Sequence, residues 1–147
     1  MNRPGETTSA VRLLLQYLEQ EGVDRIFGIP GGPIIALYEA LYARGTIKPV
    51  LTKHEGGAAF MADGYARVSG RVGVCCTTTG PGATNALTGI AVAHADHIPV
   101  LLLSAQVPTH RFGKGAFQES STEQSDIDSM FKPVTKWSTM LAHHSAT

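Results

Sequence analysis

The chain has 147 residues, 43% of them hydrophobic, which is enough for one globular domain with its own core. Twelve Lys and Arg side chains balance twelve Asp and Glu, and no basic run is present. The sequence therefore indicates neither a basic surface for nucleic acid nor a basic helix for a membrane surface. No apolar run approaches the roughly 20 residues of a membrane span, and the N-terminus lacks the pattern of a secretory signal.

The two cysteines, Cys75 and Cys76, are neighbours in an apolar run. Neighbours on a strand point to opposite faces, so these two are poorly placed to form a disulfide with each other. There is no CxxC motif, and this cysteine usage favours a reducing compartment. We therefore expect a cytoplasmic protein.

Helical and strand patterns alternate along the chain. Helices are predicted after the candidate caps Thr7, Thr8 and Ser9 as far as Gly22, between Pro33 and Gly45, from about Gly57 to Val68, and from the Gly80-Pro81-Gly82 turn to about His94. Strands are predicted at Arg25 to Ile29, Pro49 to Thr52, Val72 to Thr77 and Val100 to Ser104. A long polar loop from Val107 to Gln124, a short helix from Asp126 to Phe131 and a last strand from Thr135 to Leu141 are expected to follow.

This alternation predicts an α/β fold: a three-layer sandwich with a mostly parallel central sheet and helices on both faces. Ligands of such sheets bind beyond the carboxyl ends of the strands. The segments expected there are 30–32, 54–55, 78–82 and 104–106. Four candidate site segments therefore fall at one edge of one sheet.

Glu55 is the first candidate for chemistry, because it ends a buried strand just before two glycines. It would lie near the first turn of a helix, where the helix dipole stabilises a negative charge. One interpretation is an acid that caps this helix. The other is a partly buried carboxylate adapted to catalysis. Position in the sequence leaves both open.

The turn Gly80-Pro81-Gly82, followed by Asn85, is the second candidate. Glycine turns at helix starts often receive phosphates, but a tight connection between strand and helix uses the same residues. The turn matches neither a P-loop nor the GxGxxG of a nicotinamide-binding fold.

The other polar residues give weaker signals. None of the six histidines has metal-ligand spacing with a second strong ligand, so no metal site is predicted in this chain. His54 could line a site beside Glu55. Within the long loop, Phe117 and Gln118 are either a loop anchor or a pocket wall.

Taken together, these segments resemble the thiamine diphosphate-dependent enzymes. The matching runs are FGIPGG at 27–32, KHEGGAAFMADGYAR at 53–67 and TTGPGATN at 78–85. The runs IPV at 98–100, SAQ at 104–106 and AFQE at 116–119 resemble the acetolactate synthase branch in particular. The resemblance covers about residues 8 to 141, with four ordered motifs at sensible spacing.

The resemblance implies a role for Glu55. In the family, the matching glutamate hydrogen-bonds N1′ of the aminopyrimidine of thiamine diphosphate. This contact favours the imino tautomer, whose 4′-nitrogen takes the proton from C2 of the thiazolium, and the ring then acts as an electron sink for decarboxylation of a 2-keto acid. By the same resemblance, the positions that line the pyrimidine or its approach are Pro30, Gly31, Thr78, Pro81 and Asn85, and those near the substrate are Phe117 and Gln118.

The resemblance also implies what lies elsewhere. Family members bind the diphosphate and Mg²⁺ through a GDG…N motif in a second domain, and FAD, where present, in a middle domain; this chain has no such motif. We therefore expect residues 1–147 to be an N-terminal pyrimidine-binding domain, cut short at its C-terminal end, because the tail at 142–147 does not resemble the helix the family has there. A homodimer or tetramer through this domain is expected, with no turnover by the chain alone.

Three other interpretations stay open. The chain resembles other branches as well: decarboxylases, sulfoacetaldehyde acetyltransferases and acyl-CoA lyases. It is alternatively the natural pyrimidine-binding subunit of a two-chain enzyme, or a non-catalytic dimerisation module with the same fold. A nicotinamide-binding protein ranks below these, because the glycine pattern is wrong.

Overall fold

The computed structural model describes residues 9–141, which fold around one four-stranded sheet. Every strand pairing is parallel, and the strand order is β2-β1-β3-β4. The strands are β1 (Arg25–Gly28), β2 (Lys48–Leu51), β3 (Gly73–Thr77) and β4 (Val100–Ser104). The prediction of a parallel sheet is therefore confirmed.

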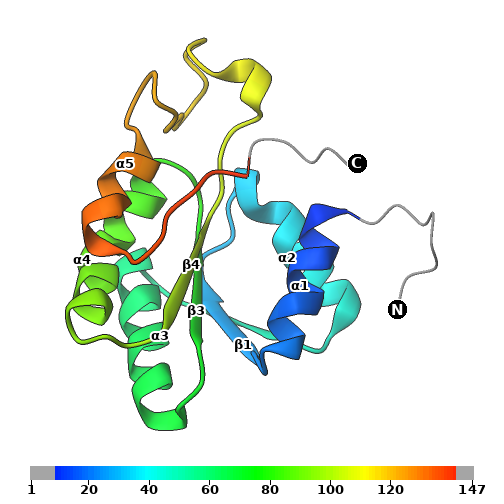
Figure 1. Ribbon diagram of the computed structural model, residues 1–147. Helices are drawn as coiled ribbons and strands as arrows, with labels where there is room; N and C mark the ends of the chain where they lie inside the picture. Colours follow the sequence, from blue (N-terminus) through cyan, green and yellow to red (C-terminus); the bar gives the residue numbers. More distant parts are fainter. Residues whose placement is uncertain (1–8, 142–147) are drawn as a thin grey trace.

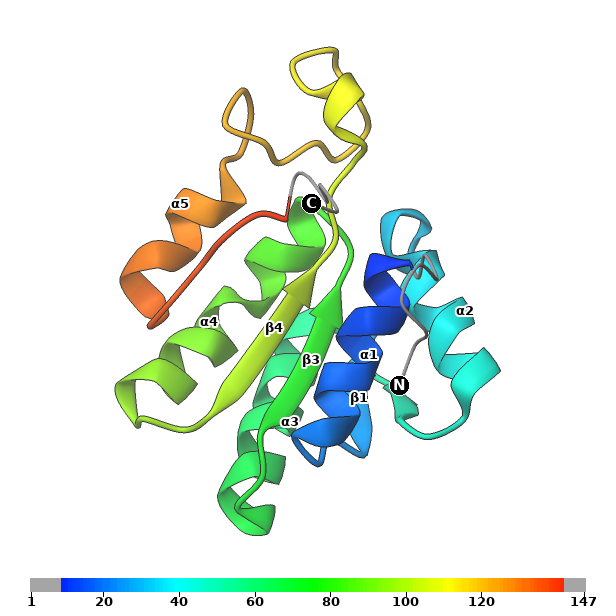
Figure 2. The same ribbon diagram turned by 45° about the vertical axis from the view of Figure 1, so that its right-hand side comes forward.

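Helices cover both faces of this sheet, as predicted (Figure 1). On one face lie α1 (Ala10–Gln20) and α2 (Ile35–Arg44), the latter preceded by a 3₁₀ turn at Gly32–Ile34. On the other face lie α3 (Glu55–Ser69), α4 (Pro81–Ala95) and the short α5 (Ile127–Phe131). A second view shows the long connection between β4 and α5 above the carboxyl ends of β3 and β4 (Figure 2).

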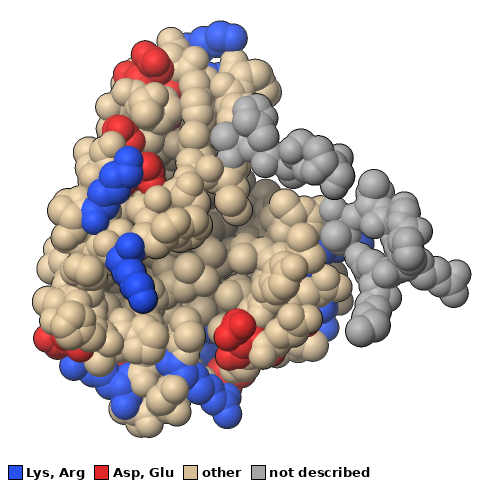
Figure 3. All heavy atoms as spheres, in the orientation of Figure 1, with Lys and Arg blue, Asp and Glu red and all other residues tan. Residues whose placement is uncertain are grey.

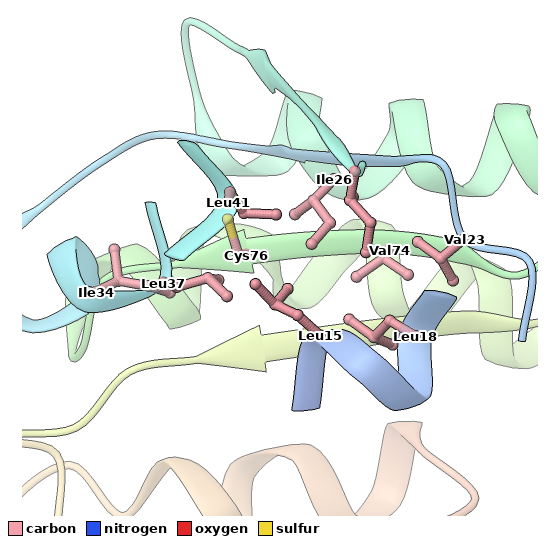
Figure 4. Close-up of a cluster of buried hydrophobic side chains, with 10 residues drawn as sticks. Leu15, Leu18, Val23, Ile26, Ile34, Leu37, Leu41, Val74 and Cys76 are labelled. Atoms are coloured by element: carbon pink, nitrogen blue, oxygen red, sulfur yellow. The ribbon is translucent and has the colours of Figure 1, made fainter. Parts of the chain in front are cut away.

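Strand β3 is buried along its whole length and divides the hydrophobic core into two clusters. Cys76 faces the α1–α2 layer, where it packs with Leu15, Ile26 and Leu41 (Figure 4). Cys75 faces the α3–α4 layer. Both thiols are free and buried, and burial raises the pKa of Cys75 to about 12. The prediction that these neighbours point to opposite faces is thus confirmed.

The α3–α4 layer packs through small side chains. Alanines form most of the buried contact between the two helices: Ala58, Ala59, Ala62, Ala83 and Ala86. Small side chains let two helix backbones approach closely. The N-terminal turns of α3 and α4 are therefore brought together at the carboxyl edge of the sheet.

Local signals explain most element ends. The Ser9 hydroxyl caps α1 by accepting a hydrogen bond from the backbone N–H of Arg12; Thr7 and Thr8 lie outside the described residues. Gly45 and Gly70 end α2 and α3 in the left-handed conformation. Helix α3 begins two residues earlier than expected, which places Glu55 inside its first turn.

The strand predicted from Thr135 to Leu141 is wrong. Residues 135–141 form no regular element, and they follow a 3₁₀ turn at Lys132–Val134. The Ser138 hydroxyl donates to Asp128 at 2.6 Å, which holds the segment against α5 instead of the sheet edge. Trp137 is 73% exposed and Leu141 84%, so the apolar pattern that suggested a strand is not buried in this structure.

Charged side chains of both signs are interspersed around the rim of the face shown in Figure 3. The centre of that face is formed by uncharged residues. Among residues 9–141, no helix has both the length and the apolar character required to cross a bilayer.

The amino ends of the strands carry a separate polar cluster around Asp24. Its carboxylate accepts hydrogen bonds from the Arg25 guanidinium at 3.0 and 3.1 Å and from the Tyr65 hydroxyl at 2.7 Å. The Arg25 and then the Tyr65 hydrogen bonds lower the pKa of Asp24 from 3.8 to about 2. Asp24 thus ties β1 to the end of α3, at the edge of the sheet away from the candidate site.

A pKa that is lower in the folded state predicts stability that is lost in acid. The contribution of ionised Asp24 should be complete above about pH 4 and should disappear as the pH falls towards 2. Asp24→Asn should therefore lower the free energy of unfolding at pH 7 and flatten its decline between pH 4 and 2, measured by urea denaturation. Glu39→Gln, at an exposed position on α2, is the control. An unchanged acid limb in Asp24→Asn would contradict the prediction.

Candidate functional site

The carboxyl ends of all four strands lie at one edge of the sheet, as parallel pairing requires. The strand order reverses direction at β1, because β2 lies on one side of it and β3 on the other. The crevice at such a switch point is where ligands of open α/β sheets bind. The segments that follow β1 and β3 at this point include 30–32 and 78–82, both of which the sequence predicted for the site.

Glu55 is the first residue of α3, at the end of the connection from β2. His54, which precedes it, is the N-cap: its Nδ1 accepts a hydrogen bond from the backbone N–H of Gly56 at 3.0 Å. The half-buried Glu55 side chain makes no capping hydrogen bond. The interpretation of Glu55 as the capping acid is therefore disfavoured, and His54 fills that role.

The Glu55 carboxylate instead faces the start of α4. Its Oε2 accepts a hydrogen bond from Asn85 Nδ2 at 3.0 Å. Its Oε1 lies 3.6 Å from the place where a Cβ on Gly82 would be. The same Cβ would lie 2.6 Å from Cγ2 of Thr78, so only glycine at position 82 lets these groups meet. Three predicted site residues, Glu55, Thr78 and Asn85, are thus brought together around Gly82.

Thr78 also joins this group to the segment after β1. A Cβ on Gly31 would lie 3.0 Å from Cβ of Thr78 and 3.1 Å from its Oγ1. The Thr78 Oγ1 atom is buried and has no hydrogen-bond partner among the described residues. Buried polar atoms in native proteins are nearly always hydrogen-bonded, so an unpartnered one calls for an explanation. Of the remaining predicted residues, Pro30 and Pro81 are exposed at the ends of the two turns.

The glycine turn itself is mostly occupied by internal hydrogen bonds. The backbone N–H of Gly80 donates to Ser120 Oγ at 3.2 Å, and that of Gly82 donates to the Thr79 carbonyl at 3.3 Å. Neither donor is therefore free to bind a phosphate. The geometry favours a tight connection between β3 and α4 over a phosphate cradle.

The predicted loop between β4 and α5 is largely irregular but fastened at several points. Phe117 is 85% exposed, so it is no anchor to this chain's core. Gln118 has a left-handed backbone (φ 59°), and its carbonyl accepts a hydrogen bond from Thr79 Oγ1 at 3.2 Å. Glu119 is 94% buried, and hydrogen bonds from the Ser121 hydroxyl and the Gly113 N–H lower its pKa.

Sequence reasoning missed part of this region. The buried Thr79 and Ser120 and the half-buried Gln106 form a hydrogen-bonded group that joins the loop to the glycine turn. Thr79 and Gln106 lie within the motifs at 78–85 and 104–106, but the sequence analysis assigned neither residue a role. No sequence signal points to Ser120, because its partners lie 14 to 41 residues away in the chain. Within residues 9–141, no cluster of three or more His, Cys, Asp or Glu side chains is arranged to hold a metal.

The close approach at Gly82 makes a prediction. Gly82→Ala should push its Cβ into Thr78 and destabilise the fold by about 1–3 kcal/mol, the usual cost of overpacking. The matched control is Gly57→Ala in α3, where an added Cβ meets nothing within 4 Å. That change should be neutral or stabilising by up to about 1 kcal/mol. Urea denaturation measures both, and equal stability of the two variants would contradict the packing described here.

Comparison with known proteins identifies the family of this chain. Residues 8–127 match the family described as thiamine pyrophosphate enzyme, N-terminal TPP binding domain. A probable acetolactate synthase large subunit from Methanocaldococcus jannaschii is 50% identical over 123 residues, covering 84% of this chain and 20% of that protein. Acetolactate synthase isozyme 3 large subunit of Escherichia coli is 46% identical over 133 residues, covering 90% of this chain and 22% of that protein.

A third relative, the acetolactate synthase large subunit of Lactococcus lactis, is 46% identical over 130 residues, covering 88% of this chain and 22% of that protein. The chain therefore spans about a fifth of the length of the relatives it matches. The matched region contains all four segments at the carboxyl edge of the sheet.

Proposed function

The chain belongs to the thiamine pyrophosphate enzymes, whose N-terminal TPP-binding domain it contains, and from that premise we propose that it binds the pyrimidine end of thiamine diphosphate for a 2-keto acid carboligase most like acetolactate synthase. The observation that supports this proposal best is the Glu55 carboxylate at the carboxyl edge of the sheet. Asn85 holds one of its oxygens, and the other faces the space beside Gly82.

The residues present suit an aminopyrimidine. Glu55 supplies a carboxylate oxygen that can accept a hydrogen bond from a protonated ring nitrogen. The Thr78 side chain lies beside it, between Gly31 and Gly82. Gly31, Pro30 and Pro81 would line the approach. When bound, thiamine diphosphate supplies a nucleophilic carbon and an electron sink for decarboxylation.

The chain's own part in the reaction is to hold a proton and to orient the ring. Glu55 would share the proton at N1′, and Asn85 would fix the carboxylate through its 3.0 Å hydrogen bond. The alanine packing between α3 and α4 sets the distance between these two side chains. Phe117 and Gln118, on the loop above β4, would contact the 2-keto acid.

The diphosphate, its Mg²⁺ and any FAD are proposed to be held outside residues 1–147. The two donors of the glycine turn that would suit a phosphate, Gly80 N–H and Gly82 N–H, are both engaged internally. A complete site then needs a second domain, and the chain alone should not turn over. Among the branches of the family, the similarity to three acetolactate synthase large subunits favours acetolactate synthase over a decarboxylase, sulfoacetaldehyde acetyltransferase or acyl-CoA lyase.

Complementation tests this proposal. The chain would be mixed with a separately expressed diphosphate-binding domain of an acetolactate synthase, thiamine diphosphate, Mg²⁺ and pyruvate. We expect acetolactate to form in this mixture, and Glu55→Gln to lower the rate by about 10²–10⁴-fold, because the amide cannot share the proton. Glu39→Gln, the same change on exposed α2, should retain the wild-type rate.

The outcomes separate the alternatives. Acetolactate formed by the chain without the added domain would sink the claim that half a site is inactive. No activity in the wild-type mixture, with the chain shown to be folded by circular dichroism, would favour a non-catalytic module instead.

We also propose a homodimer through the α3–α4 layer, in the cytoplasm, where the free thiols Cys75 and Cys76 would stay reduced. Three large apolar side chains, Phe60, Met61 and Val68, are exposed on α3, and exposed apolar surface on a helix can mark an interface.

Light scattering after size-exclusion chromatography tests the dimer. Phe60→Lys should shift the chain to monomer, because an unpaired charge would be buried at the interface. Tyr42→Lys, at an exposed aromatic residue on the opposite layer, should not. A wild-type chain that stays monomeric at all concentrations would contradict the proposal.

A further inference from the structure

We propose that Ser120 is a positioning residue: through Thr79 and Gln106 it locks the loop that carries Phe117 and Gln118 onto the Gly80–Gly82 turn. The hydrogen bonds stand on the structure itself, whereas the effect on substrate rests on the proposed function. Thr79 is fully buried and Ser120 is 97% buried, so the hydrogen bond between their hydroxyls lies away from water, whereas Gln106 is half-buried.

The direction of each hydrogen bond follows from counting donors and acceptors. Ser120 Oγ receives the backbone N–H of Gly80 at 3.2 Å and the Gln106 amide Nε2 at 3.1 Å. Both of its lone pairs are then used, so its own proton must be donated. The acceptor in reach is Thr79 Oγ1, at 2.6 Å.

Thr79 also hydrogen-bonds with the residues that hold the loop. Because it accepts from Ser120, its own proton is donated to Gln106 Oε1 at 3.0 Å or to the Gln118 carbonyl at 3.2 Å. The orientation of the Gln106 amide is fixed independently, because its Oε1 accepts the Val107 backbone N–H at 2.9 Å. Every hydroxyl and amide in this group therefore has a hydrogen-bond partner, and both acceptors within reach of the Thr79 proton belong to the loop or to the residue that holds it.

The backbone on both sides fits this arrangement. Gln118 has a positive φ (59°), and so does the facing Gly80 (φ 58°). A Cβ on Gly80 would lie 2.7 Å from the Gln118 carbonyl oxygen, so only glycine lets the loop approach the turn. Gln118 thus keeps an uncommon backbone conformation against the turn, and its position depends on the hydroxyl pair of Thr79 and Ser120.

The consequence is a link between the two halves of the proposed site. The segment 78–82 leads to the Glu55–Asn85 pair, where the cofactor's pyrimidine is proposed to bind. The segment 116–120 carries the residues proposed to meet the 2-keto acid. Ser120 touches neither ligand in this proposal; it fixes the position of one segment relative to the other.

Amide hydrogen exchange on the 147-residue chain tests the lock without any assay of activity. Ser120→Ala should free the Gly80 N–H and speed exchange at Gly80 and over residues 116–121 at least about tenfold. Ser120→Thr keeps the hydroxyl and should restore slow exchange. Ser125→Ala, at an exposed site in the same loop, should behave as wild type.

A second variant covers the case in which Ser120→Ala does not fold. Thr79→Val keeps the shape but removes the hydroxyl, so it should loosen Gln118 while leaving the Gly80–Ser120 bond. Thr79→Ser should rescue it. Wild-type exchange rates in Thr79→Val and, if folded, Ser120→Ala would overturn the lock.

Kinetics in the complemented mixture separate positioning from mere stability. Ser120→Ala should raise the KM for pyruvate about tenfold while the KM for thiamine diphosphate changes less than about twofold, and Ser120→Thr should restore the wild-type KM for pyruvate. A fall in active enzyme with unchanged KM values would overturn the positioning role. An inactive wild-type mixture would sink the proposed function, and the positioning role with it, while the exchange data would still decide whether the lock exists.

Discussion

Parallel pairing of the four strands is the constraint on which the candidate site depends. Because every strand runs in the same direction, every carboxyl end lies at one edge, and β3 in the centre must be apolar on both faces. Five consecutive buried residues in β3 meet that demand. The turns after β1, β2 and β3 then place the polar residues of segments 30–32, 54–55 and 78–82 at that edge. The direction of the strands therefore fixes the location of the candidate site, whatever side chains the turns carry.

The close pairing of α3 with α4 decides which side chains meet at this edge of the sheet. Alanines at their contact let the two helices begin side by side, so Glu55 on one reaches Asn85 on the other at 3.0 Å. The later part of the α3 motif has a structural task instead. Arg67 pairs with the buried Asp63 at 2.8 Å and with Asp96 after α4 at 2.5 Å, while Tyr65 hydrogen-bonds Asp24. One continuous motif thus serves the site at its beginning and the helix packing at its end.

The long loop shows how an irregular segment can be held without a hydrophobic anchor. Its exposed Phe117 contributes little burial, and the loop is instead held by buried hydroxyls, an amide and the Glu119 carboxylate. Polar networks of this kind have a defined geometry only when each donor finds an acceptor, as the Thr79–Ser120 pair does. Such a network specifies the position of the loop more sharply than apolar contact would, because a misplaced loop leaves buried groups unpaired.

The sequence by itself determined the alternation of helices and strands, the parallel sheet, the opposite facing of Cys75 and Cys76, and the four segments at the carboxyl edge. These follow from periodicity and glycine turns, which act over a few residues. It failed at 135–141, where an apolar pattern suggested a strand but the Ser138–Asp128 hydrogen bond and α5 hold the segment elsewhere. Only the tertiary structure decided that His54 rather than Glu55 caps α3 and that Ser120 meets Thr79. It also decided that the backbone N–H groups of the glycine turn donate to acceptors within the chain. Each of these depends on which acceptor lies within hydrogen-bond reach, and for Ser120 and Thr79 the partners are 41 residues apart.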